Sequence, residues 1–441
     1  MSAETAALPN SLWAATAAAL NSCQELPNSV RTHHLIIGAG YVGLSTALHL
    51  LEKGEQDVLV IDSAEPGWGA SGRNGGQIIS GLKQLPSDLR ATFGKEVGDK
   101  IIKGFGSSGE LLYSLVERYN IDCNLVKTGW IQVAHADKSY INTLVPRHQE
   151  WCLEGIQGRL LNRDEVAGLV GSSKGEYVGG WFDPRGGTLQ PLSYARGLAN
   201  SVMAMGGRII KHCPALSMER SGAGYLIKTP STTINAAKVI IATNAYTGSL
   251  VPGLSKTVVP VTSFQLATKP LSVQQLDSIL PGRQGITDTR RLLHYFRLDG
   301  DGRLLMGGRC PVEDAPTFHD AKNIYRALTK TFPQVEGIEM EYVWSGKVAL
   351  TKDSMPHIHI LEPNLFAALG CNGRGVANAT FLGREMAALV SGACRDTLSC
   401  PITALDPFAF HAFRRVGIVA TSTYYQMLDK LEMLRTKKNA S

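Results

Sequence analysis

The residues best suited to chemistry lie in glycine-rich loops that can hold a phosphate-bearing cofactor. The first loop is Gly38-Ala-Gly40-Tyr-Val-Gly43, a G-x-G-x-x-G motif between the apolar run 34–37 and a helical pattern over 44–51. Gly38 permits a tight turn, Gly40 lets the backbone approach a pyrophosphate, and Gly43 allows the helix to pack closely on the strand. The N-terminus of the helix then stabilises the phosphate charge.

A carboxylate closes the strand that follows this motif. Asp62 ends the apolar run 57–61 and stands 19 residues after Gly43. A carboxylate there accepts hydrogen bonds from ribose hydroxyls, which disfavours NADP and leaves NAD and FAD open. A second G-x-G-x-x-G, at 104–109, has no clear strand before it and no acidic strand end after it. We therefore expect that copy to be a helix start or a packing site.

The segment 67–77 favours FAD over NAD. Four of its glycines fall within eight positions, at 69, 72, 75 and 76, which excludes a strand or helix interior. The loop also carries side chains suited to phosphates and to a polar ring system, namely Ser71, Arg73, Asn74 and Gln77.

Composition describes an ordinary globular protein large enough for two packed layers. The chain has 441 residues, 44% hydrophobic and 19% charged, and its 44 basic against 38 acidic residues give a net charge of +6. No Lys/Arg-rich tract accompanies that charge, so we expect no nucleic-acid partner. The eight cysteines are too dilute for a disulfide scaffold, and the pair His357 and His359 lacks a third ligand, so no metal is expected.

The two ends of the chain bear on its location. The N-terminus carries Glu4 in place of a basic segment, which argues against a secretory signal. Residues 5–24 are interrupted by polar residues and do not make a membrane span. These features predict a cytoplasmic protein. Residues 407–434 have apolar positions at helical spacing, and packing on the protein itself is favoured over docking to a partner or a membrane surface.

The loop sequences carry a family resemblance. G-A-G-Y-V-G-L-S-T-A-L-H-L at 38–50 and G-W-G-A-S-G-R-N-G-G-Q at 67–77 resemble the FAD-dependent D-amino-acid oxidase (DAO) superfamily, and most closely its γ-glutamylputrescine oxidase-like amine oxidases. The resemblance continues through Trp130–Ala134, Gly187–Pro191, Ala242–Ala245, Tyr295–Arg297, Gly307–Arg309, Trp344–Asp353 and Gly370–Val376. It covers about residues 30–400.

The resemblance implies an α/β fold in which a Rossmann-like, doubly wound FAD-binding domain is interleaved with an α+β substrate domain on a large mixed or antiparallel sheet. The expected divisions are 30–125, 187–257 and 341–405 for FAD, 126–186 and 258–340 for substrate, 1–29 as an N-terminal extension and 406–441 as a C-terminal helical tail.

The same resemblance assigns cofactor contacts. The implied FAD-binding residues are Gly38, Ala39, Gly40, Tyr41, Val42, Gly43, Asp62, Ser71, Gly72, Arg73, Asn74, Gly75, Gly76, Gln77, Ala215, Ala242, Thr243, Asn244, Gly373, Arg374, Gly375 and Val376. Relatives that attach flavin covalently use a His in the second loop or a Cys near the late W-x-G segment. Ala70-Ser71-Gly72 has no His and 344–353 has no Cys, so we expect non-covalent FAD.

The implied chemistry is oxidation of a C–N bond. Hydride would pass from the carbon next to the amine to flavin N5, water would hydrolyse the imine to an aldehyde or keto product, and electrons would go to O2 or another acceptor. A γ-glutamylputrescine-type amine is the leading substrate, and imino-acid, D-amino-acid, sarcosine- or pipecolate-type substrates stay open. An NAD-dependent dehydrogenase and an FAD-holding subunit without activity of its own are the competing classes.

Four residues are the candidates for catalysis. Lys347 would place a cation near the flavin, and Arg297, like Arg309, could pair with a substrate carboxylate. Arg374 belongs to the last glycine loop, and Tyr295 is a candidate for an apolar wall together with Phe264 and Trp344. The oligomeric state is left open.

Overall fold

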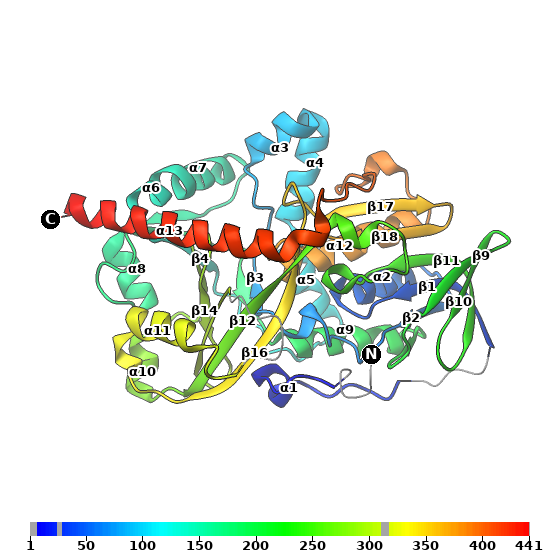
Figure 1. Ribbon diagram of the computed structural model, residues 1–441, viewed down its shortest axis with the longest axis horizontal. Helices are drawn as coiled ribbons and strands as arrows, with labels where there is room; N and C mark the ends of the chain where they lie inside the picture. Colours follow the sequence, from blue (N-terminus) through cyan, green and yellow to red (C-terminus); the bar gives the residue numbers. More distant parts are fainter. Residues whose placement is uncertain (1–6, 24–28, 310–316, 441) are drawn as a thin grey trace.

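Two large sheets make up the protein (Figure 1). The computed structural model describes residues 7–23, 29–309 and 317–440, with side chains up to residue 436. The first sheet has the order β17-β18-β11-β1-β2-β8, and β10 and β9 extend it beside β11. Its strands are β1 (Ser29–Ile37), β2 (Val58–Ile61), β8 (Arg208–Ile210), β9 (Ser217–Ser221), β10 (Gly224–Lys228), β11 (Thr233–Ile241), β17 (His357–Glu362) and β18 (Leu365–Leu369).

The centre of the first sheet is parallel, as the Rossmann-like pattern predicts. β1 pairs in parallel with β11 on one side and with β2 on the other, and β18 and β8 continue the parallel order. The strand ends 35–37 and 58–61 are buried on both faces, which explains their unbroken apolar runs. Helices cover one face, namely α2 (Tyr41–Glu52), α5 (Ser108–Arg118), α9 (Pro191–Ala204) and α12 (Gly375–Val390).

The second sheet is mixed, as expected for the substrate half. Its order is β16-β12-β15-β14-β13-β4-β6-β5, antiparallel except where β13 runs parallel to β4. The strands are β4 (Trp130–Ala134), β5 (Arg159–Leu161), β6 (Gly179–Asp183), β12 (Val259–Pro270), β13 (Gly285–Asp288), β14 (Tyr295–Leu298), β15 (Arg303–Arg309) and β16 (Met340–Leu350). The third FAD-binding segment was expected to begin at 341. Because β16 pairs with β12, residues 341–350 belong to the second sheet instead.

Shorter elements complete the chain. They are α1 (Leu12–Thr16), β3 (Gln77–Ile78), α3 (Pro86–Phe93), α4 (Lys95–Gly106), α6 (Asp137–Ser139), α7 (Val145–Leu153), α8 (Arg163–Val170), β7 (Gly187–Thr188), α10 (Val273–Ser278), α11 (Lys322–Thr331) and α13 (Arg414–Ala440). The second glycine motif falls on α4 and α5, where Gly104 packs against Ser399 and Phe381. It is a helix-packing site, as the sequence predicts.

One side chain fixes the second glycine loop to the second sheet. The Gln77 amide donates to the carbonyls of Ile286 (2.9 Å) and Phe296 (3.2 Å) in the second sheet. Its oxygen accepts from Trp130 Nε1 (3.2 Å) and Thr287 Oγ1 (3.0 Å). All of these groups are buried, so the four hydrogen bonds set the position of the second glycine loop relative to the second sheet.

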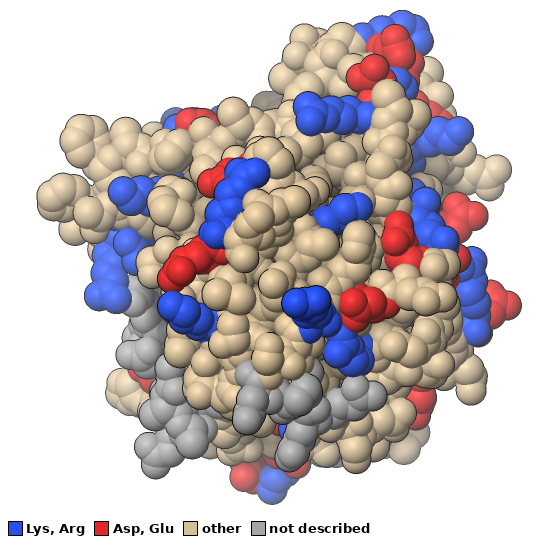
Figure 2. Space-filling view, turned by 90° about the vertical axis from the view of Figure 1, so that its right-hand side faces the viewer, with Lys and Arg blue, Asp and Glu red and all other residues tan. Residues whose placement is uncertain are grey.

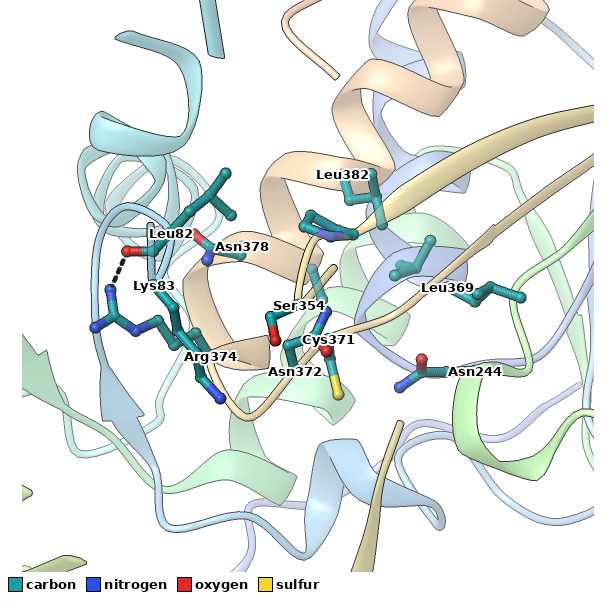
Figure 3. Close-up of a pocket in the computed structure, with 13 residues that line it drawn as sticks. Leu82, Lys83, Asn244, Ser354, Leu369, Cys371, Asn372, Arg374, Asn378 and Leu382 are labelled. Atoms are coloured by element: carbon teal, nitrogen blue, oxygen red, sulfur yellow. Dashed lines mark hydrogen bonds between the residues drawn. The ribbon is translucent and has the colours of Figure 1, made fainter. Parts of the chain in front are cut away.

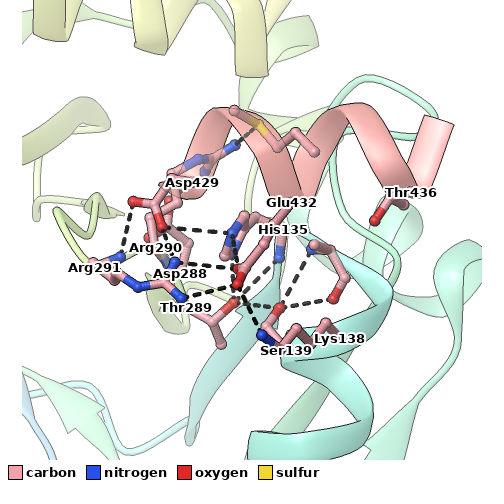
Figure 4. Close-up of polar contacts among 12 residues, drawn as sticks. His135, Lys138, Ser139, Asp288, Thr289, Arg290, Arg291, Asp429, Glu432 and Thr436 are labelled. Atoms are coloured by element: carbon pink, nitrogen blue, oxygen red, sulfur yellow. Dashed lines mark hydrogen bonds and ion pairs between the residues drawn. The ribbon is translucent and has the colours of Figure 1, made fainter. Parts of the chain in front are cut away.

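The C-terminal helix α13 runs across the front of the molecule (Figure 1) and is fastened by ion pairs (Figure 4). Arg291 binds Asp429 at 2.6 Å and Glu432 at 2.8 Å, and His135 Nε2 lies 3.7 Å from Glu432. Within the described chain, His135, Asp429 and Glu432 are the one group that could hold a metal ion. Because Arg291 already supplies a cation between the two carboxylates, we interpret this group as the anchor of α13.

Surface charge agrees with the composition. On the face shown in Figure 2, basic and acidic residues are interspersed. In the described part of the chain, no helix is both long and apolar enough to span a membrane.

The turn between β1 and α2 should tolerate no side chain at Gly43. A Cβ there would lie 1.9 Å from the carbonyl oxygen of Gly38. We expect Gly43→Ala to lower the free energy of unfolding by about 1–3 kcal/mol, measured by urea denaturation and circular dichroism. Gly168→Ala on α8, where a Cβ meets no atom within 4 Å, is the matched control and should raise it by up to about 1 kcal/mol. Equal effects of the two substitutions would contradict the packing argument.

Candidate active site

A cavity of about 980 Å³ is lined by both sheets and collects the three glycine loops. This volume lies at the upper end of the range for small-molecule pockets. Segments that are far apart in sequence meet there, and they include 37–42, 62–63, 68–71, 73–75, 213–216, 241–251, 260–263, 308–309, 346–348 and 371–376.

Most of the residues predicted from sequence line this cavity. They are Gly38, Ala39, Gly40, Tyr41, Val42, Asp62, Ser71, Arg73, Asn74, Gly75, Gln77, Ala215, Ala242, Thr243, Asn244, Tyr295, Arg309, Lys347, Gly373, Arg374, Gly375 and Val376. The cavity lining does not include Gly43, Gly72, Gly76 and Arg297.

The first loop is a backbone cradle. Gly38 has a φ of +114°, and a Cβ there would lie 2.7 Å from the carbonyl oxygen of Ala242 on the neighbouring strand. Only glycine fits both conditions. The Tyr41 N–H, in the first turn of α2, donates to Ser71 Oγ at 2.9 Å and so joins the first loop to the second. At the start of α2, the chain therefore presents backbone atoms to the cavity without an intervening side chain.

Asp62 lines the cavity beside the segment 213–216, since the Cys213 N–H donates to the Asp62 backbone carbonyl at 2.7 Å. Its carboxylate accepts hydrogen bonds from the N–H groups of Ala39 (2.7 Å) and Ala64 (2.9 Å). Burial raises the pKa of Asp62, and the two N–H groups oppose that rise. A carboxylate has about four lone-pair directions, so it can still accept hydrogen bonds from a ligand.

The second loop is braced from within. The Asn74 amide donates to the carbonyls of Ala70 (3.1 Å) and Ser71 (2.8 Å), and its oxygen accepts from Gly76 N at 2.8 Å. Arg73 donates from Nε to the Trp68 carbonyl at 2.7 Å. These bonds hold the loop in one shape, so its cavity-facing groups are fixed before any ligand binds.

Three residues of this loop differ from their expected role as cofactor contacts. A Cβ at Gly72 would lie 2.4 Å from Gly67 O, and one at Gly76, where φ is +65°, would lie 2.1 Å from Leu189 O. These glycines are required for packing. Gln77 lines the cavity, but its amide is committed to the second sheet.

The third loop joins strand β18 to helix α12. Gly370 (φ +91°) and Gly373 (φ +83°) make the turn possible, and Asn244 Oδ1 accepts from Gly370 N at 2.9 Å. That bond ties the end of β11 to the third loop. Gly373 and Gly375 both face the cavity, and the first-turn N–H groups of α12 have no acceptor within the helix. The start of α12 therefore favours negative charge in the cavity.

Four cations gather beside this loop: Lys83, Arg147, Arg309 and Arg374. The Asp183 carboxylate acts on two of them, Arg147 and Arg374, but its ion pair is with Arg185. Figure 3 shows Lys83 and Arg374 next to each other at a side pocket of about 30 Å³. Arg374 donates to the Leu82 carbonyl at 2.7 Å, and Arg147 donates to the Lys83 carbonyl at 2.7 Å. Within the described chain, none of the four forms an ion pair.

Electrostatics of this cation group favour an anionic ligand. Burial, and then the charges of Arg374, Arg309 and Arg147, lower the pKa of Lys83 to about 8, although its side chain is open to the cavity. The Nε and Nη1 groups of Arg147 are buried and have no hydrogen-bond partner in the described chain. A bound carboxylate would relieve both effects.

Lys83 and Arg147 were not anticipated from the sequence. Lys83 follows the second loop by six residues, and that proximity is the one signal that could have indicated it. Arg147 lies on a helix whose sequence shows no motif.

The predicted catalytic residues divide into two groups. Tyr295 and Lys347 line the cavity, and Tyr295 OH shares a hydrogen bond with Ser263 Oγ at 3.0 Å. Burial raises the pKa of the Tyr295 hydroxyl, so it stays protonated. Lys347 Nζ lies 6.0 Å from the centre of the Tyr246 ring.

Arg297 does not fit its predicted role in substrate binding. It is buried, donates to the Leu189 carbonyl at 2.8 Å and lies 4.9 Å from the Trp13 ring centre. Gly76 packs against its guanidinium, and Arg297 is not among the residues that line the cavity. Phe264 and Trp344, the other candidates for an apolar wall, belong to hydrophobic cores and do not line the cavity.

Comparison with known proteins agrees with this site. The DAO family, described as FAD dependent oxidoreductase, matches residues 33–389. The chain belongs to the DAO family of FAD-dependent oxidoreductases. This DAO-family chain is 32% identical over 406 residues to the probable oxidoreductase OrdL of Haemophilus influenzae, covering 90% of this chain and 91% of that protein. It is 31% identical over 425 residues to the gamma-glutamylputrescine oxidoreductase of Escherichia coli, covering 96% and 98%.

Solved structures agree on the fold. The glycine oxidase of Geobacillus kaustophilus superposes with a TM-score of 0.68 at 20% identity, covering 86% of the DAO-family chain and 97% of the oxidase. The features of the cavity also suit FAD: a glycine cradle that a Cβ would fill, a carboxylate, and a helix N-terminus with cations beside it.

The Asp62 carboxylate should contribute directly to cofactor affinity. A hydrogen bond to a charged group contributes about 1.5–3 kcal/mol, so we expect Asp62→Asn to weaken FAD binding about ten- to hundredfold. Fluorescence titration of apoprotein with FAD measures the change. Asp277→Asn, at an exposed position on α10, is the control and should bind FAD like the unmodified protein. If Asp62→Asn bound FAD as tightly as the unmodified protein, the Asp62 carboxylate would not be part of the FAD site.

Proposed function

We propose that this DAO-family oxidoreductase binds FAD without a covalent bond and oxidises the C–N bond of an amine that also carries a carboxylate, of the γ-glutamylputrescine type. The observation that supports this substrate class is the group of four unpaired cations beside the third loop. The name of the Escherichia coli relative, a gamma-glutamylputrescine oxidoreductase, points to the same class.

The two sheets that line the cavity would have separate roles. We propose that the first sheet, with the three glycine loops, holds FAD, and that the second sheet, with Tyr295 and Arg309, holds the substrate. When bound, FAD would accept a hydride from the carbon next to the amine. Arg309 and Lys83 would bind the substrate carboxylate, and Tyr295 would limit where the chain of the substrate can lie. Together these contacts orient the C–H bond.

The lining contains no acid–base pair. Asp62 is the one acidic side chain among the described lining residues, its carboxylate is bonded to the N–H groups of Ala39 and Ala64, and none of those residues is a histidine. An amine that binds in its neutral form needs no side-chain base. Lys347 and the start of α12 would stabilise negative charge that develops nearby.

The proposal has a direct test. The purified protein should be yellow, and acid precipitation should release its flavin as free FAD. A substrate panel with peroxide or dye detection should give a kcat/KM for γ-glutamylputrescine at least about tenfold above that for putrescine, which lacks the carboxylate. Glycine, sarcosine, pipecolate and D-amino acids complete the panel. A colourless protein that cannot be reconstituted, or a preference for putrescine, would refute the proposal.

Arg309 should bind the carboxylate of the substrate and not its amine. Arg309→Met should raise KM for γ-glutamylputrescine about ten- to hundredfold and leave the KM of putrescine within a factor of two or so, since only one substrate has the charge. Lys322→Met, at an exposed position on α11, controls for loss of a positive charge and should change neither KM. Equal losses for both substrates would show that Arg309 is structural.

Lys83 should give the reaction a pH dependence. Its pKa is lowered to about 8, so it is charged below that pH and loses its charge as the pH rises. Because only the charged form attracts a carboxylate, binding of γ-glutamylputrescine should weaken above about pH 8. The ratio of kcat/KM between unmodified protein and Lys83→Met removes the titration of the substrate itself, and this ratio should fall with rising pH. Lys83→Arg should abolish that fall, and a flat ratio for the unmodified protein would contradict the role.

A further inference from the structure

The outer face of α13 exposes an unusual amount of apolar surface. Eight of the fifteen exposed large hydrophobic side chains in the described chain fall within 410–434, so the exposure is concentrated and not scattered. They are Phe410, Phe413, Val416, Val419, Tyr424, Met427, Leu431 and Leu434. Contiguous apolar surface of this kind marks an interaction site.

Helical geometry places the six of these side chains that lie on α13 in one stripe, and Phe410 and Phe413 precede the helix. At 3.6 residues per turn, Met427 lies three turns after Val416, and Leu434 lies two turns after Met427. Asp429 and Glu432 fall on the opposite side of the helix, where they bind Arg291. The helix is therefore apolar on its outer side and acidic on its inner side.

Polar contacts keep the stripe turned outward (Figure 4). Besides the two ion pairs to Arg291, Thr436 accepts a hydrogen bond from Asp137 N at 3.2 Å. Asp429 is also bonded to the Arg291 N–H at 3.0 Å. A roll of the helix that buried the stripe would break these contacts and place two carboxylates in water without their partner.

The exposed charges of α13 have one sign. Between residues 414 and 436 the exposed charged side chains are Arg415, Lys430 and Arg435, all basic. The acidic residues of the helix are turned inward. A second copy of this face would bring basic residues against basic residues, whereas an anionic lipid surface complements both the charge and the apolar stripe.

We infer that α13 is a docking helix by which the protein binds the surface of an anionic lipid bilayer. The apolar stripe would enter the boundary between headgroups and acyl chains, and Lys430 and Arg435 would contact anionic headgroups. The helix would lie in the plane of the surface, with the remainder of the protein held behind it by the Arg291 anchor.

Co-sedimentation of the full-length holoenzyme with vesicles tests this inference. Vesicles of phosphatidylglycerol and phosphatidylcholine in equal parts should bind the protein, added salt should release it, and phosphatidylcholine alone should bind it weakly. Lys430→Gln/Arg435→Gln should lower the partition coefficient about thirtyfold, from the effect of two basic residues at a charged surface. Met427→Gln/Leu434→Gln should lower it more than about tenfold.

Two controls distinguish a loss of membrane docking through α13 from a general effect of the substitutions on the folded protein. Leu153→Gln on α7, where the side chain is 86% exposed, removes apolar surface elsewhere and should not alter binding. All variants should retain the flavin spectrum and turnover in solution. The inference would be overturned if the protein did not bind the anionic vesicles. It would also be overturned if the α13 variants bound them as strongly as the unmodified protein. Light scattering that shows a dimer which Met427→Gln/Leu434→Gln dissociates would overturn it too, because the face would then serve a second copy.

Discussion

The close backbone approach at the first glycine loop is the constraint on which the rest of the site depends. Gly38 touches Ala242 on the neighbouring strand, and Gly43 touches Gly38 itself. Because no side chain separates these groups, β1, β11 and the start of α2 converge on one point. The second loop then attaches there through Ser71, and the third through Asn244. A cavity lined by both sheets is the consequence of these contacts.

Groups of opposite charge line the cavity. Its lining includes the Asp62 carboxylate, which accepts hydrogen bonds, and the N-terminus of α12 with a group of cations that form no ion pair within the described chain. None of these cations forms an ion pair within the described chain, and Arg147 is buried with two nitrogens that lack a hydrogen-bond partner, so an anionic ligand would stabilise the group. The proposed FAD, with its phosphates, and the proposed substrate, with its carboxylate, would together satisfy the arrangement. A simple diamine does not, since it would add positive charge to a site that already has an excess.

The sequence predicts features that depend on neighbours in the chain and misses those that depend on the assembled fold. Gly38, Asp62 and the parallel strands follow from local patterns, because a turn, a strand end and an apolar run are each defined within a few residues. Lys83 and Arg147 carry no such pattern, and only the packing of α7 against the second loop brings them together. Arg297 shows the reverse case. Its place in a family motif suggested a substrate contact, but in the fold it contacts the Leu189 carbonyl and the Trp13 ring and does not line the cavity.

A crystal structure of the protein with its bound flavin tests the central claim most directly, namely that the three loops close around one FAD. The predicted electron density has the adenine end beside Asp62 and Ala215, the pyrophosphate at the start of α2, and the ring system between Tyr295 and the start of α12. Flavin density outside this cavity, or a flavin that contacts only one of the three loops, would contradict it.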